Sequence, residues 1–344
     1  MSEPRQIEDL PPLIIGGAVF NTQYSEDPTK LPVQEIILTA FSKGMNALDT
    51  SPYYGQSEEL IGDALEKIAD EWPRESYFIC TKAGRIKLDD FDYSRSWVRK
   101  SVLRSLERLH TSYLDLVYMH DIEFVEDEEI FEALKELVAL KKEGVIRNFG
   151  ISAYPVEILL KIAQECNTTY KSEIGPLDAI LSYSNGCIQN TKLLSLYDKF
   201  FDTGIKKLLN GSILSMSMLR SGKTHDFHPA PKELKEKVDE IAKGLQKEDN
   251  VELADLATRF ALKRWLFQTG EGKNPQNTVT YPLERNKKLS VVLGVSSLDE
   301  LDVALESYNT VKNEQGAKDE ELFTKVEKQL GPEHYNETWS SGRY

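Results

Sequence analysis

Four polar residues, at or just beyond the ends of short apolar runs, are the part of this chain best suited to chemistry. Asp49, Lys82 and His120 end three such runs, and Tyr54 follows Asp49 by five residues. Short apolar runs bounded by turn residues are typical of buried parallel strands, where a charged side chain is costly unless it has a role. If these strands lie side by side in one sheet, the four side chains meet at one mouth. The pattern predicts an enzyme active site.

The chemistry that these residues suit is proton transfer at an oxygen. A free phenol has a pKa near 10, too high for a base at neutral pH. An ammonium such as Lys82 can lower the pKa of Tyr54, and Asp49 can keep that ammonium charged and oriented. His120 can donate a hydrogen bond to the substrate oxygen. With no nucleophile and no metal-ligand cluster nearby, this set predicts hydride transfer to or from a nicotinamide, and no metal.

Each residue also has an ordinary structural explanation. Asp49 could belong to a helix-capping turn with residues 50–52. Lys82 could be a strand-end surface lysine, and His120 a core histidine. Their joint placement at successive strand ends favours the functional interpretation.

Apolar runs alternate with amphipathic helical patterns along most of the chain. The ends of successive predicted strands are roughly 30 residues apart, enough for one strand, one helix and two short loops. Eight such units close an α/β fold, the (β/α)8 TIM barrel, whose sites lie at the C-terminal mouth. The competing doubly wound open sheet usually has fewer strands and a glycine fingerprint after the first. The predicted strands are 13–16, 47–50, 77–82, 114–120, 148–152, 179–184, 206–212 and 291–294.

Two segments depart from this rhythm. Residues 268–290 are polar and contain glycine and proline, which predicts a mobile insertion on the surface. We therefore expect one barrel domain over residues 1–311 that carries this insertion. Residues 312–344 form a tail, and Trp339 near its end predicts that the tail packs on the barrel.

Composition limits the function classes. A net charge of −14 over 344 residues argues against binding nucleic acid or an anionic membrane. Cys80, Cys166 and Cys187 are an odd number of widely spaced cysteines, which favours a reducing compartment. No secretion signal and no apolar run of the ~18 residues needed for a membrane helix are found. We expect a cytoplasmic protein with a small-molecule substrate and no obligate protein partner.

Three motifs carry a resemblance to a known family. Residues 49–55 (DTSPYYG), 80–82 (CTK) and 114–121 (LDLVYMHD) resemble the catalytic motifs of the aldo-keto reductase superfamily. The resemblance covers about residues 10–310. It implies a (β/α)8 barrel that uses NAD(P)(H), with Tyr54 as proton donor and acceptor, Lys82 and Asp49 tuning it, and His120 orienting the substrate.

Within the family, the chain resembles the sugar 1-dehydrogenases at residues 91–95, 107–111, 212–217, 291–297 and 339–342. These enzymes oxidise the anomeric carbon of an aldose, such as D-arabinose, to an aldonolactone. Two other interpretations stay open. One is an NADPH-dependent carbonyl reductase, and the other is a redox-inert subunit that senses a nicotinamide.

The resemblance also implies the cofactor contacts. Ser152 corresponds to a residue that binds the nicotinamide carboxamide, whereas Ala153 and Leu181 depart from the family's usual residues there. Ser184 falls where a tyrosine usually stacks on the ring, and Tyr183 could replace it only if the register slips by one residue. The other predicted contacts are Gly17 and Ala18 near the cofactor backbone, Ser212, Leu214 and Ser217 at the pyrophosphate, and Gly294, Ser296 and Ser297 at the adenosine side.

Glu300 bears on the choice between NAD and NADP. It aligns with the arginine that binds the 2′-phosphate in NADP-preferring members, and a carboxylate there repels phosphate and can accept a hydrogen bond from the ribose 2′-OH. It could also be an ordinary acidic residue at a helix start. The resemblance with this departure predicts NAD. Phe20 and Tyr24 are predicted to wall the sugar pocket, although either could simply cover the barrel mouth.

Overall fold

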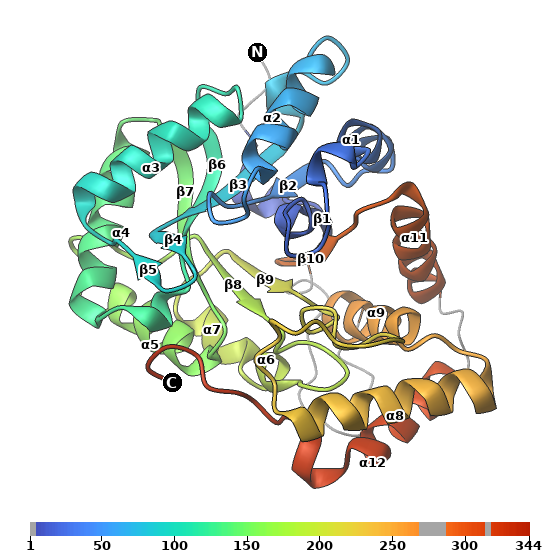
Figure 1. Ribbon diagram of the computed structural model, residues 1–344. Coiled ribbons are helices and arrows are strands. Elements are labelled where there is room, and N and C mark those ends of the chain that lie inside the picture. Colours follow the sequence, from blue (N-terminus) through green and yellow to red (C-terminus); the bar gives the residue numbers. More distant parts are fainter. Residues whose placement is uncertain (1–4, 268–286, 314–317) are drawn as a thin grey trace.

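The computed structural model describes residues 5–267, 287–313 and 318–344. Eight parallel strands form a closed barrel with helices around it (Figure 1). The barrel closes because β1 pairs with both β10 and β2, and the prediction of a (β/α)8 barrel is confirmed. In the order around the barrel, the strands are β1 (Leu13–Gly16), β10 (Leu289–Gly294), β9 (Lys207–Gly211), β8 (Ala179–Tyr183), β7 (Ile146–Ala153), β6 (Leu114–His120), β3 (Phe78–Ala83) and β2 (Ala47–Asp49).

Helices connect and cover the strands. They are α1 (Val33–Ser42), α2 (Ser57–Lys67), α3 (Arg95–Arg108), α4 (Asp127–Lys142), α5 (Val156–Asn167), α6 (Lys192–Ser195), α7 (Tyr197–Asp202), α8 (Lys232–Asp249), α9 (Leu253–Leu262), α11 (Leu298–Lys312) and α12 (Asp319–His334). A short antiparallel hairpin, β4 (Arg85–Lys87) with β5 (Asp90–Phe91), follows β3 and was not predicted. No helix among the described residues is both long and apolar enough to span a bilayer.

The barrel interior is filled by alternate residues of its strands. Successive side chains on a strand point to opposite faces, so each strand sends every second residue inwards. The inward set is a separate buried cluster that includes Cys80, and Ile7 and Leu10 extend it ahead of β1. The remaining strand residues point outwards to the helices and form the larger core. All three cysteines are buried and free.

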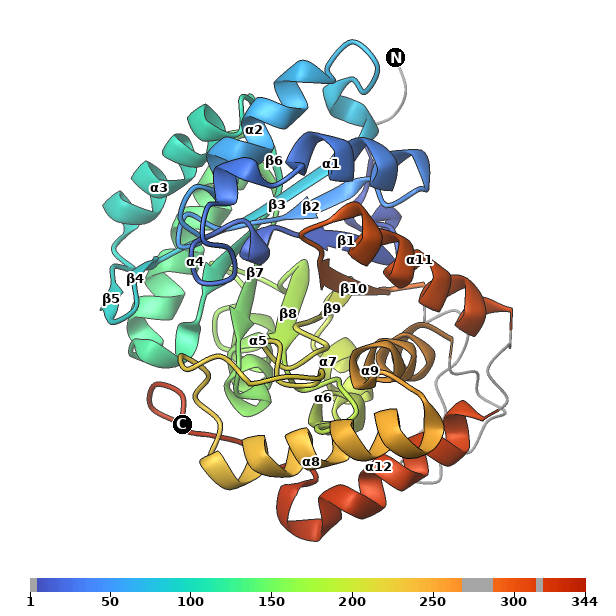
Figure 2. The same cartoon turned by 45° about the vertical axis from the view of Figure 1, so that its right-hand side comes forward.

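A third buried cluster lies outside the barrel, between α8, α9 and α12. Its members on α12 are Phe323, Val326 and Leu330, and α12 runs beside α8 in both views (Figure 2). The amphipathic pattern of α8 has an apolar stripe that needs such a cover.

The end of the chain after α12 lies against the loops that follow β6, β7 and β8. Trp339 stacks on Tyr154, with ring centroids 4.5 Å apart. The hydroxyl of Ser341 donates to the Glu123 carboxylate at 2.9 Å, and the amide of Gln189 donates to the carbonyl of Glu337. These contacts hold the segment close to the C-terminal mouth of the barrel.

The predicted insertion at 268–290 is only partly within the described residues. Residues 268–286 lie outside them. Residues 289 and 290 belong to β10, which is two residues longer at its start than the predicted strand 291–294. The insertion boundary was therefore placed too late, because Ser290 is polar and hides the strand pattern.

Gly62 offers a test of how tightly the helix layer packs. A Cβ at Gly62 would lie 2.0 Å from the backbone oxygen of Arg108, at the end of α3, and backbone cannot yield as a side chain can. We expect Gly62→Ala to lower the free energy of unfolding by about 3 kcal/mol, measured by chemical denaturation. The matched control is Gly244→Ala in α8, where a Cβ meets nothing within 4 Å. That change should raise stability by about 0.5–1 kcal/mol. Equal effects of both changes would contradict the assigned contact.

Candidate active site

The register of the strands brings the predicted catalytic residues to the barrel mouth. Side chains level with each other in neighbouring parallel strands share one face, and Asp49 is level with Cys80, which lies in the barrel interior. Lys82 is level with Tyr118, another interior residue, and His120 is level with Ser152. These strand-end side chains therefore converge inside the C-terminal rim, as the sequence predicted.

Asp49 and Lys82 form a buried ion pair. The ammonium Nζ donates to Oδ1 of Asp49 at 2.5 Å and to the carbonyl oxygen of Thr50 at 3.0 Å, and the lysine side chain is only 1% exposed. Burial opposes the charge on Lys82, but Asp49 and Tyr54 together raise its pKa above the ordinary value. The lysine is therefore a fixed cation at neutral pH.

Tyr54 lies between this cation and His120. The Nζ atom of Lys82 is 4.9 Å from the centre of the Tyr54 ring, and the Tyr54 and His120 rings meet edge-on with centroids 5.6 Å apart. Burial raises the pKa of Tyr54, and Lys82 opposes that rise only in part. The expected lowering of this pKa is thus wrong for the protein by itself. The reason is that desolvation of a phenolate at this depth outweighs one neighbouring cation.

His120 is a neutral imidazole. Its Nδ1 lies 3.0 Å from the Ser51 hydroxyl, and burial lowers its pKa to about 3. If the Ser51 hydroxyl donates to Nδ1, the ring proton is on Nε2. Nε2 is then a hydrogen-bond donor that can orient an oxygen of the substrate.

The opposite side of the mouth is lined by glycine. Three strands have glycine as their last inward-facing residue: Gly16 in β1, Gly211 in β9 and Gly294 in β10. Gly16 pairs with Gly294, and Gly211 pairs with Tyr183. A Cβ at Gly294 would meet Cγ1 of Val19 at 2.8 Å. One side of the mouth thus carries ionisable groups, and the other presents backbone without side chains, where a larger residue would clash with its neighbours.

The structure shows which way the two candidate residues for the ring stack face. Ala179 and Leu181 face the barrel interior, so Tyr183 faces inward as well, and it pairs with Gly211 without any register slip. Ser184 follows the opposite face, is completely buried and has a positive φ of 61°. Tyr183 is the better candidate for stacking on a ring because it is only half-buried at the mouth.

Ser152, predicted to bind the carboxamide, lies at the barrel mouth. It is level with His120, it is completely buried, and its Oγ has no hydrogen-bond partner within the described residues. A buried hydroxyl without a partner costs free energy unless a ligand supplies one. Ser152 thus fits a role in holding an amide.

The loop after β9 is strained. Ser212, Ser215, Met216 and Ser217 have φ between 48° and 66°, which costs about 1–2 kcal/mol for each residue that is not glycine. The Ser212 hydroxyl accepts a hydrogen bond from the Met216 N–H at 2.7 Å and so holds the turn. Turns of this kind can direct backbone N–H groups at an anion. The cofactor contacts of Ser212, Leu214 and Ser217 stay predictions, and this geometry suits them.

The start of α11 contains the residues predicted for the adenosine side. The Ser297 hydroxyl caps the helix by accepting from the Glu300 N–H, and Oε2 of Glu300 accepts from the N–H and hydroxyl of Ser296. Glu300 is exposed, so it serves the helix start and still faces solvent. The two roles considered for Glu300 are compatible.

The structure bears on the predictions made for the first loop. Gly17 is explained by packing, since a Cβ there would lie 2.5 Å from Oγ of Ser57 on α2; the predicted cofactor contacts of Gly17 and Ala18 stay untested. Phe20 is completely buried in the core that faces the helices, so its prediction as a pocket wall is wrong. A single aromatic residue in a loop does not reveal which way it points.

Tyr24 and two residues that the sequence analysis missed form an aromatic cluster. The Tyr24 ring packs edge-on against His225 and Phe227, with centroids 5.7 and 5.5 Å apart. Burial, and then the charges of Tyr54 and Tyr53, raise the pKa of Tyr24 to about 12, which places it near the mouth. In the sequence, the sign of the missed pair was one aromatic residue, Phe227, within a polar segment. The structure shows that Phe227 is exposed.

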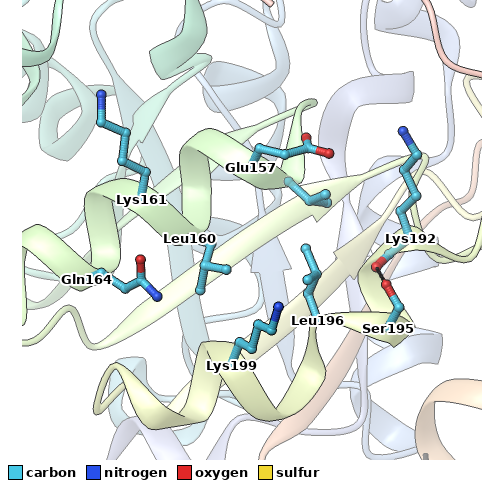
Figure 3. Close-up of a pocket in the computed structure, with 9 residues that line it drawn as sticks. Glu157, Leu160, Lys161, Gln164, Lys192, Ser195, Leu196 and Lys199 are labelled. Carbon is cyan, nitrogen blue, oxygen red and sulfur yellow. Dashed lines mark hydrogen bonds between the residues drawn. The ribbon is translucent and has the colours of Figure 1, made fainter.

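A groove on the outside of the barrel is not part of this site. It lies between α5 and the α6–α7 segment, and Lys161, Lys192 and Lys199 project from its edges (Figure 3). None of the converging strand-end residues lines it. Lys161 is paired with Asp127, so its charge is already compensated.

Comparison with known proteins shows the family to which the chain belongs. The model of the Aldo/keto reductase family matches residues 12–320. D-arabinose 1-dehydrogenase of Saccharomyces cerevisiae is 50% identical over 343 residues, 98% of this chain and 96% of the relative. L-galactose dehydrogenase of Arabidopsis thaliana is 32% identical over 330 residues, 95% of this chain and 91% of the relative. An aldo-keto reductase structure from Bacillus halodurans, 19% identical, has a TM-score of 0.63 over 97% of this chain and 95% of that chain, which shows the same fold.

The Asp49–Lys82 pair has a testable energetic consequence. Asp49→Asn leaves the buried ammonium without its counter-charge, so we expect a loss of about 3 kcal/mol in the free energy of unfolding. Removing the cation as well, in Asp49→Asn/Lys82→Met, should recover part of that loss. The matched control is Asp239→Asn, which breaks an exposed pair with Lys243 and should cost less than about 0.5 kcal/mol. A loss at Asp49 as small as at Asp239 would show that the pair does not hold Lys82 in place.

Proposed function

Since the chain belongs to the aldo/keto reductase family, we propose that it is an NAD-dependent aldose 1-dehydrogenase. The proposed reaction oxidises C1 of D-arabinose or a similar aldose to the aldonolactone. The observation that carries the proposal is the placement of Tyr54 between the Lys82 cation and His120 at the barrel mouth. The substrate class is supported by the 50% identity to D-arabinose 1-dehydrogenase over nearly the whole chain.

In the proposed mechanism, Tyr54 moves the proton. Its phenolate oxygen accepts the proton of the C1 hydroxyl while the C1–H bond breaks, and C1 becomes a carbonyl carbon. Lys82 stabilises the phenolate by its charge, and Asp49 holds Lys82 in place. His120 donates from Nε2 to the same substrate oxygen and fixes its direction.

The family uses a nicotinamide cofactor, and several residues at the mouth fit one. When bound, the nicotinamide supplies the acceptor for the hydride that leaves C1. Tyr183 would stack on its ring, Ser152 would bind its amide, and the strained loop at 212–217 would hold its phosphates. Each of these residues has a feature that the fold alone does not require: a half-buried ring, an unpartnered buried hydroxyl and a left-handed turn.

NAD rather than NADP is the proposed cofactor because Glu300 is anionic. Its carboxylate lies at the exposed start of α11, beside Ser296 and Ser297. A phosphate on the ribose 2′ position would meet this charge, whereas a 2′-hydroxyl could donate to it. The carbonyl reductase interpretation would favour a cation at this position.

The cofactor proposal is tested by the initial rate of NADH formation from D-arabinose. We expect strong activity with NAD and little with NADP. Glu300→Arg should lower kcat/KM for NAD and raise kcat/KM for NADP by about tenfold or more, as expected for a gain of roughly 1.4 kcal/mol in phosphate binding. Asp299→Arg makes the same charge change one residue earlier on the same helix turn and should leave the preference nearly unchanged. No activity with any aldose, together with consumption of NADPH by aldehydes, would establish the reductase instead.

The proton-transfer proposal is tested by pH. Because burial raises the pKa of Tyr54 above 10, the base form is scarce at pH 7 and its fraction rises tenfold per pH unit. We therefore expect kcat/KM for aldose oxidation to increase with pH up to the limit of stability. Tyr54→Phe should reduce kcat at least 100-fold and flatten this profile while NADH binding, followed by its fluorescence, is retained.

The control for this substitution is Tyr308→Phe, a half-buried tyrosine of α11 remote from the mouth. It should leave both rate and pH profile as they are. Retention of most activity in Tyr54→Phe would show that another group moves the proton.

A further inference from the structure

Asp121, directly after His120, is a buried carboxylate that the mechanism above does not use. Its side chain is 2% exposed, and its backbone is left-handed, with φ of 56°. Hydrogen bonds fix this backbone on both sides: the Asp121 N–H donates to the Ser152 carbonyl at 2.8 Å, and the Tyr93 hydroxyl donates to the His120 carbonyl at 2.6 Å. Strain at a residue that is not glycine persists only where the surroundings enforce it.

Arg85 fixes the side chain of Asp121. Its Nη1 donates to Oδ2 of Asp121, its Nη2 donates to the carbonyl of Leu88, and its Nε donates to the carbonyl of Lys87. The guanidinium also lies over the Tyr53 ring, 4.0 Å from the centroid. The β4–β5 hairpin therefore presents a preorganised cation to one oxygen of this carboxylate.

Asp121 lies among the groups of the active site. Its Oδ2 is 3.6 Å from Nε2 of His120, the nitrogen proposed to face the substrate. Its charge is among the causes that raise the pKa of Tyr54 and of Tyr183, after burial in both cases. The carboxylate is thus close to both the proton-transfer group and the proposed stacking residue.

The second oxygen of Asp121 is unsatisfied. Across residues 5–267, 287–313 and 318–344, no group of the protein forms a hydrogen bond with Oδ1, although this atom is buried. Burial, and then the charge of Asp121, raise the pKa of neighbouring Glu123 to about 8. A buried carboxyl oxygen without a hydrogen-bond partner is costly, so a ligand that supplies a partner would be favoured.

We propose that Asp121, held by Arg85, is a specificity residue that accepts a hydrogen bond at Oδ1 from a ring hydroxyl of the sugar near C1. This inference rests on the proposed aldose dehydrogenase function. A sugar has such donors on the carbons next to C1, whereas a simple aldehyde has none. A site built to bind a hydroxyl discriminates strongly against an analogue without it, because the buried acceptor is then left unpaired. Asp121 thus separates aldoses from plain aldehydes.

The experiment compares D-arabinose with its 2-, 3- and 4-deoxy analogues in the wild type and in Asp121→Asn. For the hydroxyl that Asp121 binds, we expect the wild type to lose about 100-fold in kcat/KM when that hydroxyl is removed. Asp121→Asn should lower kcat/KM for D-arabinose by a similar factor. On the deoxy sugar that lacks the bound hydroxyl, the kcat/KM values of the variant and the wild type should differ by less than about threefold. The matched control is Asp89→Asn at the exposed tip of the hairpin, which should behave as the wild type on all sugars.

Two further outcomes show whether the Asp121 proposal or the proposed function is wrong. Equal losses for Asp121→Asn on every sugar, and on reduction of a simple aromatic aldehyde with NADH, would show that Asp121 acts only by positioning His120 and would overturn the proposal. A wild type that tolerates every deoxy sugar also overturns it, even if the variant does not fold. If the wild type oxidises D-arabinose, the proposed function stands in both cases; if it oxidises no aldose, both proposals fall together.

Discussion

The buried pair between Asp49 and Lys82 is the interaction on which the site depends. Two opposite charges, 4% and 1% exposed, are held at 2.5 Å by two neighbouring strands. Neither charge is tolerable there alone, so the pair requires β2 and β3 to keep their register, and that register requires the closed barrel. The fixed cation then sets the electrostatic environment of Tyr54. The catalytic geometry is thus a property of the whole barrel.

The mouth of the barrel has two chemically distinct sides. Strands β2, β3, β6, β7 and β8 end inward in Asp49, Lys82, His120, Ser152 and Tyr183, whereas β1, β9 and β10 end in glycine. Proton transfer needs desolvated charges in fixed positions, and binding of a flat ring needs space and backbone contact. Each strand contributes one inward residue at that level, so the two kinds of strand end lie on different parts of the same rim.

The sequence predicted the barrel, its strands and the four converging residues, since strand ends and their spacing are local patterns. It did not predict burial, and this explains the errors. Phe20 was expected at the pocket because a loop aromatic looks available, yet it lies in the core. The rise in the pKa of Tyr54 depends on depth, which no spacing reveals. The inward direction of Tyr183 could have been inferred by counting two residues from Leu181, because alternate residues of a strand share a face. The hairpin that contains Arg85 was missed because strands of two or three residues leave no periodic signal.

Closure of the barrel between β1 and β10 also has a consequence for how the protein is made. Leu13 pairs with Val291, so the partners are 291 − 13 = 278 residues apart. At ribosomal speeds, the first strand waits on the order of 15 to 60 s for its neighbour to be synthesised. Throughout that interval one edge of an apolar strand lacks its partner, and such an edge invites pairing with other chains. The yield in the cell should therefore depend on translation rate as well as on final stability.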